Sequence, residues 1–316
     1  MNIYAAGLSL IRSIQQYESP FLDTVMKGLS FLGSPVPYLV LVPLLFWCVD
    51  ERRALRLALL LLFSAWLNSS LKMLFAQPRP YDLDPGVARA YEGGVSGRYG
   101  LPSGHAQTSL VLALGLASWK KKATVYVPAL CVVFLISLSR LYLGVHFPTD
   151  ILAGWFTGLL IFAADRLLFP LLAALLEAGG VRARLITLAL LTFMMNSLHA
   201  WDPGPGGLLL GFGGGYVLMK SRFPFCAGLP VEQRAPGDSS GDAEIRRTPK
   251  RLRLALRYVF GMAGLCLLSI ALKKLLPGEG SPYYALARFC RYGAAGFWVS
   301  AAAPAFFVRF SLARSG

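Results

Sequence analysis

The sequence predicts an all-α integral membrane protein, a helical bundle of about nine transmembrane helices. Of its 316 residues, 55% are hydrophobic and only 15% are charged, whereas soluble domains carry about 25% charged residues. Apolar runs of roughly 15–22 residues, bounded by charge or by Gly and Pro, recur along the chain. In lipid such runs must be helical, because their backbone polar groups need partners within the segment. A soluble protein would have to bury all of these runs in one core.

Two amphipathic segments, residues 1–18 and 19–34, precede the first expected span. Each places its apolar residues along one helical stripe. Ser19 and Pro20 are typical of an N-cap followed by a first-turn proline, so the second helix is expected to begin there. Two interpretations of these segments stay open: helices that lie in the membrane interface, or helices that pack on the bundle.

Nine apolar segments are expected to cross the membrane, and they divide the chain into three parts. Residues 1–34 form the interfacial helices, 35–170 a core that holds the polar motifs described below, and 171–316 a C-terminal extension. Within that extension, residues 221–250 are expected to form a polar cytoplasmic loop. The spans are expected at 35–49, 54–75, 103–119, 123–141, 148–169, 184–200, 206–220, 252–274 and 291–310.

The distribution of Lys and Arg predicts the orientation of these spans. When residues 50–56 are placed inside, the inner segments hold 20 of the 31 Lys and Arg residues, and 11 remain outside. The N-terminus is then outside and the C-terminus inside. The net charge of +15 is accounted for mainly by this bias, so no nucleic-acid partner is expected.

The remaining Cys, His and N-terminal features predict no metal site, disulfide framework or leader. The five cysteines are scattered, with no CxxC and no Cys/His cluster, and are expected to pack as small apolar residues. His199 lies near the outside end of a span and is expected to be an interfacial residue. The N-terminal segment lacks a basic region and a small-residue cleavage site, so no separate signal peptide is expected.

Three polar segments interrupt the apolar pattern: KMLFAQPRP (72–80), PSGH (102–105) and SRLYLGVHFPTD (139–150). The first two share one outside loop. Two expected spans separate His105 from Arg140, so the third segment returns to the same face. All three segments are therefore expected to meet at the outer surface of the membrane.

The cations of these segments indicate an anion site. Lys72, Arg79 and Arg140 would repel one another unless an anion lay between them, and a dianionic phosphate would satisfy all three. Arg supplies bidentate donors to phosphate oxygens and Lys supplies a point charge. Ser103 stands at an expected N-cap, where the following amides point toward a bound anion.

Two histidines near one phosphate suggest a nucleophile and an acid. His146 comes just before Pro148, which is typical of the first turn of a helix. Asp150, four residues further on, can reach the second ring nitrogen of His146. This contact would fix the tautomer of His146 and stabilise its imidazolium form. His105 would be the second histidine.

Each residue also has a structural explanation when it is taken alone. A His or Arg at a helix end can be an interfacial anchor, Arg140 can pair with Asp150, and Lys72 can snorkel. Taken together, three cations, two histidines, a carboxylate and a glycine-containing helix start on one face are more simply explained by a phosphate-handling site.

The spacing of these segments resembles the signature of the type-2 phosphatidic acid phosphatase superfamily over roughly residues 20–170. The motifs K-x6-R-P, P-S-G-H and S-R-x5-H-x3-D are intact and in order. The later segments LLLGFGGGYVLMKS and RFCRYGAAGFWVSAAAPAFF, with the outside N-terminus and nine spans, are similar to the sphingosine-1-phosphate phosphatase and glucose-6-phosphatase branch. The specified positions are Lys72, Arg79, Pro80, Pro102, Ser103, Gly104, His105, Ser139, Arg140, His146 and Asp150.

The resemblance implies a metal-independent phosphatase that needs no cofactor. His146 would attack phosphorus and form a phosphohistidine, with Asp150 orienting its ring. His105 would protonate the leaving alcohol and then activate water. The phosphoryl oxygens would be held by Lys72, Arg79, Arg140, Ser103 and the amide of Gly104.

The expected substrate is a lipid phosphomonoester: phosphatidate, lysophosphatidate or a sphingoid-base phosphate, taken from among the membrane lipids. Alternatives are a prenyl diphosphate phosphatase, a lipid phosphotransferase, a sugar-phosphate enzyme or a non-catalytic lipid transporter. Paired broken helices in repeated halves would indicate a transporter, and no internal repeat is evident in the sequence. Residue usage favours a bacterial inner membrane with the site facing the periplasm; in a eukaryote the site would face the ER lumen. Oligomeric state is not determined by the sequence.

Overall fold

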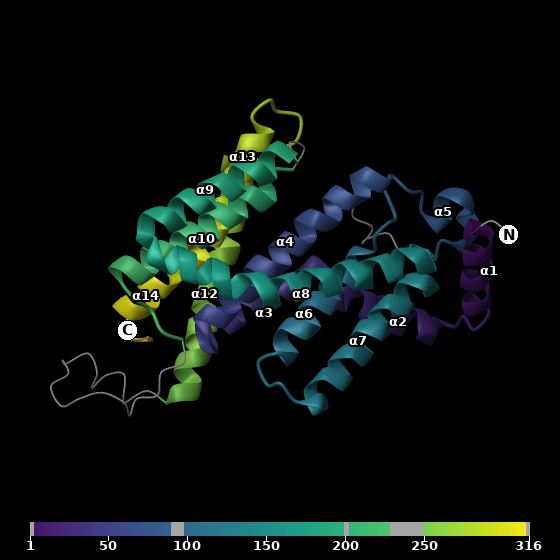
Figure 1. Cartoon of the computed structure of the whole chain (residues 1–316), viewed down its shortest axis with the longest axis horizontal. Helices are drawn as coiled ribbons and strands as arrows, with labels where there is room; N and C mark the ends of the chain where they lie inside the picture. Colours follow the sequence, from purple (N-terminus) through teal and green to yellow (C-terminus); the bar gives the residue numbers. More distant parts are fainter. Residues whose placement is uncertain (1–2, 90–97, 199–201, 228–248, 314–316) are drawn as a thin grey trace. The chain divides into compact units, whose positions relative to one another are not determined.

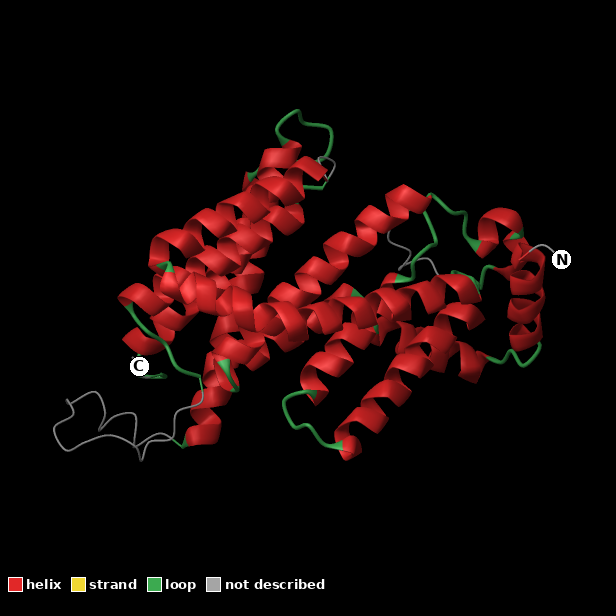
Figure 2. Ribbon diagram, in the orientation of Figure 1, coloured by secondary structure: helices red, strands yellow, loops and turns green. Residues whose placement is uncertain are grey.

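The computed structural model describes residues 3–89, 98–198, 202–227 and 249–313, and these form helices joined by turns and loops (Figure 2). The prediction of an all-α protein is confirmed for these residues. The chain divides into two compact units. Unit 1 comprises Met1–Leu39 and Leu60–Pro170, and unit 2 comprises Val40–Leu59 and Leu171–Gly316.

Unit 1 begins with the helices α1 (Ile3–Gln15) and α2 (Pro20–Leu32), followed by the start of α3 (Pro35–Cys48). The predicted start of α2 is confirmed: the Oγ of Ser19 accepts the backbone N–H of Leu22 at 3.2 Å, and Pro20 lies in the first turn. The sequence did not indicate the 49° bend between α2 and α3, which together could form one broken span.

The apolar stripes of α1 and α2 contact protein. On α1, Tyr4, Leu8 and Ile11 pack against Val87 and Phe147. The stripe of α2 packs on a second cluster, and its contacts are those of Leu22, Met26 and Leu29 with Tyr142, Leu143 and Val145. Phe21 and Leu32 on the α2 stripe are exposed, so both interpretations stay predictions.

The rest of unit 1 consists of helices that carry the three polar segments to one place. They are α4 (Glu51–Phe75), α5 (Pro80–Leu83), η1 (Pro85–Val87), α6 (Gly104–Ala117), α7 (Ala123–Tyr142) and α8 (Pro148–Ala178), where α4 and α8 each also extend into unit 2. Leu110 and Leu114 of α6, Val133 of α7 and Trp155 and Phe162 of α8 pack together. Figure 1 shows α6, α7 and α8 as neighbouring teal helices.

Unit 2 is built around closely packed small residues. It contains α9 (Gly180–Leu198), α10 (Gly204–Arg222), α12 (Lys250–Leu275), α13 (Tyr284–Phe297), the π-helical η2 (Trp298–Ala302) and α14 (Ala303–Arg309). A Cβ atom at Gly211 of α10 would lie 1.9 Å from the backbone oxygen of Gly293 of α13. Only glycine permits this approach, which is typical of helix pairs in membranes. Unit 2 also contains a largely buried ion pair, in which Nζ of Lys220 lies 2.9 Å from Oε1 of Glu51.

The number of spans remains a prediction. Each of the nine expected segments lies largely within helices, but in the part of the chain that is described only five helices are long and apolar enough to cross a membrane, or six with the bent pair. The helices α3 and α6 have 14 residues each. At 1.5 Å per residue they reach about 21 Å, short of a hydrocarbon core of about 30 Å. His199 and most of the loop 221–250 lie outside the described residues, and the division into three parts stays a prediction.

Candidate active site

The three polar segments come together in unit 1, around a buried His–Asp pair. The Nδ1 atom of His146 lies 3.1 Å from Oδ2 of Asp150, and that oxygen also accepts the N–H of Phe147 at 2.9 Å. The contact expected between His146 and Asp150 is therefore present. It arises because α8 begins at Pro148, which places Asp150 in the first turn. With Nδ1 turned to the carboxylate, Nε2 of His146 is the ring nitrogen left for chemistry.

Ser103 and His105 lie at the start of α6, and each has a buried polar atom with no hydrogen-bond partner among the described residues: Oγ of Ser103 and Nε2 of His105. Ser103 is the N-cap residue, as predicted, but its hydroxyl makes no capping bond. These two atoms are therefore available to a ligand.

The three cations approach the same region from three elements. Lys72 Nζ donates to the backbone oxygens of Tyr99 and Gly100, both at 2.8 Å. Arg79 Nη1 donates to the backbone oxygen of Val145, the residue that precedes His146, at 3.1 Å. Arg140, in the last turn of α7, is 1% exposed, as is Arg79.

The charges act together on His146. Its burial, and then the charges of Lys72, Arg79, Arg140 and His105, hold the pKa of His146 well below its ordinary value. Each of these groups is close enough to His146 to oppose a positive charge on the imidazole. The free protein therefore favours the neutral form of His146, which is the form that can attack an electrophile.

Backbone spacing at two glycines shapes the site. A Cβ atom at Gly100 would lie 2.9 Å from Oδ2 of Asp150, and one at Gly104 would lie 3.0 Å from Oδ1 of Asn68. Gly104 therefore stands at a close approach between α6 and α4. Its backbone amide, expected from the sequence to face the phosphate, lies in the first turn of α6.

A polar network of Ser64, Asn68 and Gln107 lies next to the site, and no motif in the sequence predicts it. Gln107 Nε2 donates to the backbone oxygen and the hydroxyl of Ser64, at 2.8 and 3.0 Å. Asn68 Nδ2 donates to Oε1 of Gln107 at 2.8 Å and to the backbone oxygen of Pro102 at 3.2 Å. Two amide side chains within expected spans were the available signal, because polar groups at membrane depth are costly and pair with one another.

Among the residues that the structure describes, no three His, Cys, Asp or Glu side chains gather to hold a metal ion. The five cysteines are free. Metal independence of the reaction stays a prediction.

The fold and the site define a class: a helical membrane protein with a buried site of three cations, two histidines and one carboxylate. Residues 53–172 match the PAP2 superfamily, and residues 239–315 match the PAP2 superfamily phosphatase, transmembrane extension. The chain belongs to the PAP2 superfamily, a family of phosphatases. The resemblance inferred from the three motifs is confirmed.

The relatives are named as phosphatases. The chain is 32% identical over 169 residues to lipid phosphate phosphatase delta of Arabidopsis thaliana, covering 49% of this chain and 40% of that protein. It is 30% identical to phosphatidylglycerophosphatase B of Bacillus subtilis, over 51% of this chain and 81% of that protein. It is also 30% identical to a probable sphingosine-1-phosphate phosphatase of Dictyostelium discoideum, over 48% of this chain and 39% of that protein. The match thus spans about two fifths of the plant and amoebal relatives.

Proposed function

We propose that this protein hydrolyses a lipid phosphomonoester through a phosphohistidine at His146. The observation that carries the proposal is the buried contact between His146 and Asp150 in the field of Lys72, Arg79 and Arg140. A carboxylate on Nδ1 leaves Nε2 as the nucleophilic atom, and buried cations lower the energy of the charge that develops on the phosphoryl oxygens.

In the first step, Nε2 of His146 forms a bond to phosphorus while the bond from phosphorus to the ester oxygen breaks. His105, protonated beside the bound phosphate dianion, gives that proton to the leaving alcohol, whose oxygen would otherwise depart as an alkoxide, and becomes neutral. Asp150 accepts the Nδ1–H and stabilises the positive charge that the phosphorylated imidazole carries.

In the second step, water attacks phosphorus and the bond from phosphorus to Nε2 breaks. The neutral His105 takes one proton from this water, so inorganic phosphate leaves and both histidines return to their starting forms. The phosphoryl oxygens are held throughout by Lys72, Arg79, Arg140, the Ser103 hydroxyl and the Gly104 amide.

A phosphate on a lipid is the substrate class that we propose, namely phosphatidate, lysophosphatidate or a sphingoid-base phosphate. It is supported by the relatives, whose names are those of lipid phosphate phosphatases, and by the apolar helices around the site. The experiment is phosphate release by the full chain in detergent across these lipids, prenyl diphosphates and sugar phosphates. Release mainly from prenyl diphosphates or sugar phosphates would contradict the assignment. Transfer of the phosphoryl group to an added lipid alcohol in place of water would indicate a phosphotransferase.

The phosphohistidine is tested on the same preparation. Acid quenching with radiolabelled substrate should trap acid-labile phosphate in the wild type and none in His146→Ala. The matched control is His199→Ala, which removes the one histidine assigned no role and should trap as much as the wild type. Acid-labile phosphate on His146→Ala would show that another residue is the nucleophile.

Metal independence follows from the proposed site, because three cations already meet the phosphate charge. Turnover should survive EDTA, and orthovanadate should inhibit, since vanadate adopts the five-coordinate geometry of a transferring phosphoryl group. Loss of turnover in EDTA with recovery in Mg²⁺ would rule the account out.

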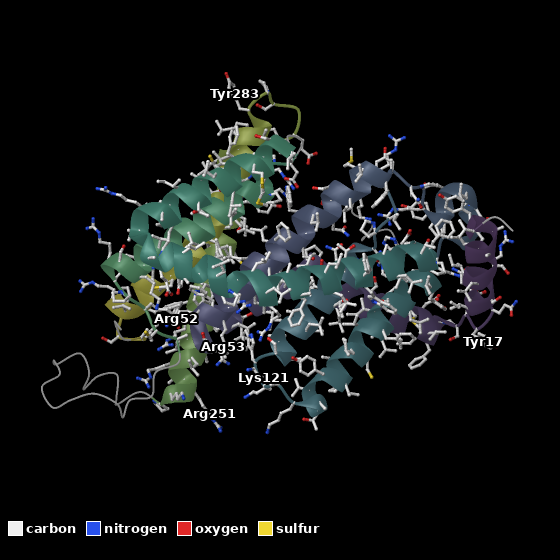
Figure 3. The ribbon with its side chains drawn as sticks, in the orientation of Figure 1. Tyr17, Arg52, Arg53, Lys121, Arg251 and Tyr283 are labelled. Carbon is white, nitrogen blue, oxygen red and sulfur yellow. The ribbon has the colours of Figure 1, made fainter. Side chains whose placement is uncertain are left out.

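We place the site at the outer face of the membrane, periplasmic in a bacterium and luminal in the ER. The support is the charge distribution: Arg52, Arg53, Lys121 and Arg251, labelled in Figure 3, are exposed at helix ends in segments expected to be cytoplasmic. A cysteine placed at Ser96 should react with an impermeant reagent from outside, whereas one at Ser240 should not. Both positions lie outside the described residues, so the prediction rests on the sequence alone.

A further inference from the structure

Helix α2 reaches the site with a side chain that no motif contains. The Nη1 atom of Arg140, in the last turn of α7, donates a hydrogen bond to Oγ of Ser30 on α2. Ser30 is fully buried and Arg140 is 1% exposed. The two residues lie 110 positions apart, and Ser30 precedes residues 53–172, which match the PAP2 superfamily.

The residue that caps the end of α2 lies against a second residue of the site. A Cβ atom at Gly33, which caps the end of α2, would lie 2.8 Å from Cδ2 of His105 and 2.7 Å from Cγ2 of Ile136. The end of α2 is therefore in contact with both Arg140 and His105. A larger residue at this position would force the side chain of His105 or Ile136 to shift.

Contacts away from the site hold α2 on α7. The hydroxyl of Tyr142 donates to Oδ1 of Asp23, and Met26 packs with Tyr142 and Leu143. These contacts fix where Ser30 stands along α7. They also allow the docking of the helix to be tested separately from the contact with Arg140.

We propose that Ser30 is a positioning residue, which orients the guanidinium of Arg140 for the phosphoryl group. The inference rests on the proposed function, since it assigns Arg140 to phosphate. A guanidinium has five N–H donors in a rigid plane. One donor committed to Ser30 fixes the rotation of that plane, and the remaining donors then face a fixed direction. Arg140 thereby binds phosphate without first losing rotational freedom.

The test measures binding of orthovanadate to the full chain in detergent. The quantity compared is the orthovanadate concentration at which the rise in melting temperature reaches half of its maximum. Ser30→Ala should raise this concentration about tenfold, as expected for a lost hydrogen bond to a charged group. Thr24→Ala is the matched control: it removes a hydroxyl from α2 that, in the described part of the chain, donates to the backbone oxygen of Pro20 at 2.9 Å. It should leave the concentration within about twofold of the wild type.

Asp23→Asn separates positioning from docking. It weakens the contact of α2 with Tyr142, so it should lower the melting temperature while vanadate binding stays near that of the wild type. If Ser30→Ala does not yield monodisperse protein, Ser30→Cys, which keeps the size but accepts hydrogen bonds weakly, takes its place.

Two results would overturn the inference. One is a vanadate midpoint for the Ser30 variant that matches Thr24→Ala. The other is an equal rise in Asp23→Asn, which would assign the effect to docking of α2 in general. A wild type that binds vanadate but releases phosphate from no substrate would contradict the proposed function alone, and the Ser30 comparison would still hold. A wild type that binds no vanadate would contradict both.

Discussion

The backbone N–H of Ser103 donates to the backbone oxygen of Asp150 at 2.8 Å. This bond joins the first turn of α8 to the residue that precedes α6. Two helix N-termini therefore lie side by side at the candidate site, and each carries a partial positive charge that favours an anion. The bond also explains how the segments 102–105 and 139–150 keep a fixed separation.

The junction of α6 and α8 should be sensitive to a single methyl group. A Cβ atom at Gly154 of α8 would lie 2.7 Å from the backbone oxygen of Ser103. Gly154→Ala should push the two helices apart, cost about 1–3 kcal/mol of stability and lower kcat. Gly28→Ala is the control, since nothing lies within 4 Å of a Cβ atom at that position. Equal activity and melting temperature in the two variants would contradict the packing described.

Asp150→Asn should reduce turnover by about 10²-fold or more with any substrate, because an amide can donate to Nδ1 of His146 and impose the wrong tautomer. The measurement is kcat on folded, monodisperse protein. Asp84→Asn is the matched control, because Asp84 pairs with Arg12 on α1 and has no assigned role in the reaction. Full activity of Asp150→Asn would remove the orienting role.

His105→Ala should depend on the leaving group. The loss of a general acid costs typically about 10²–10⁴-fold for a lipid ester, whose alcohol needs a proton. A nitrophenyl ester needs little protonation, so the first step with this substrate should be largely restored in His105→Ala and stay absent in His146→Ala. A burst of nitrophenol measured by stopped flow reports that step. If the activated ester does not distinguish the two variants, the assigned roles are wrong.

The contribution of His146 to stability should fall as the pH is lowered below about 6.5. His146 has a pKa well below its ordinary value, chiefly because it is buried and then because of Lys72, Arg79, Arg140 and His105. Below its ordinary pKa of about 6.5 the unfolded chain binds a proton that the folded protein does not, so each pH unit costs up to about 1.4 kcal/mol. The melting temperature from pH 7.5 to 5 should therefore fall less steeply for His146→Gln than for the wild type. Equal slopes would contradict the shifted pKa.

The network behind the site should contribute stability independently of catalytic chemistry. Gln107→Leu would remove the hydrogen bonds that Gln107 makes with the amide of Asn68 and with Ser64, at a cost of about 1–3 kcal/mol. Ser269→Ala is the control, because the hydroxyl of Ser269 donates to the backbone oxygen of Leu265 in its own helix, α12, at 2.7 Å. Thermal unfolding in detergent measures both, and a Gln107 variant as stable as the control would show that the network is dispensable.

The helical membrane class, the family and the residues that gather at the site were all predictable from the amino-acid sequence. Hydropathy and motif spacing are properties of short segments, so they located α7, the start of α8 at Pro148 and the approach of Asp150 to His146. These features depend on contacts within a few residues or on the alternation of sides between successive spans.

The other segments that reach the site became evident from the packing of the helices. The contact of Ser30 with Arg140 and the bonds from Gln107 to Ser64 depend on packing between helices far apart in the chain. A stripe of apolar residues shows that a helix has a partner but not which one, because lipid and protein satisfy the stripe equally well. The partner of α2 follows from the shape of α7 and from the hydrogen bonds that buried polar groups must make, and neither is written in a local pattern.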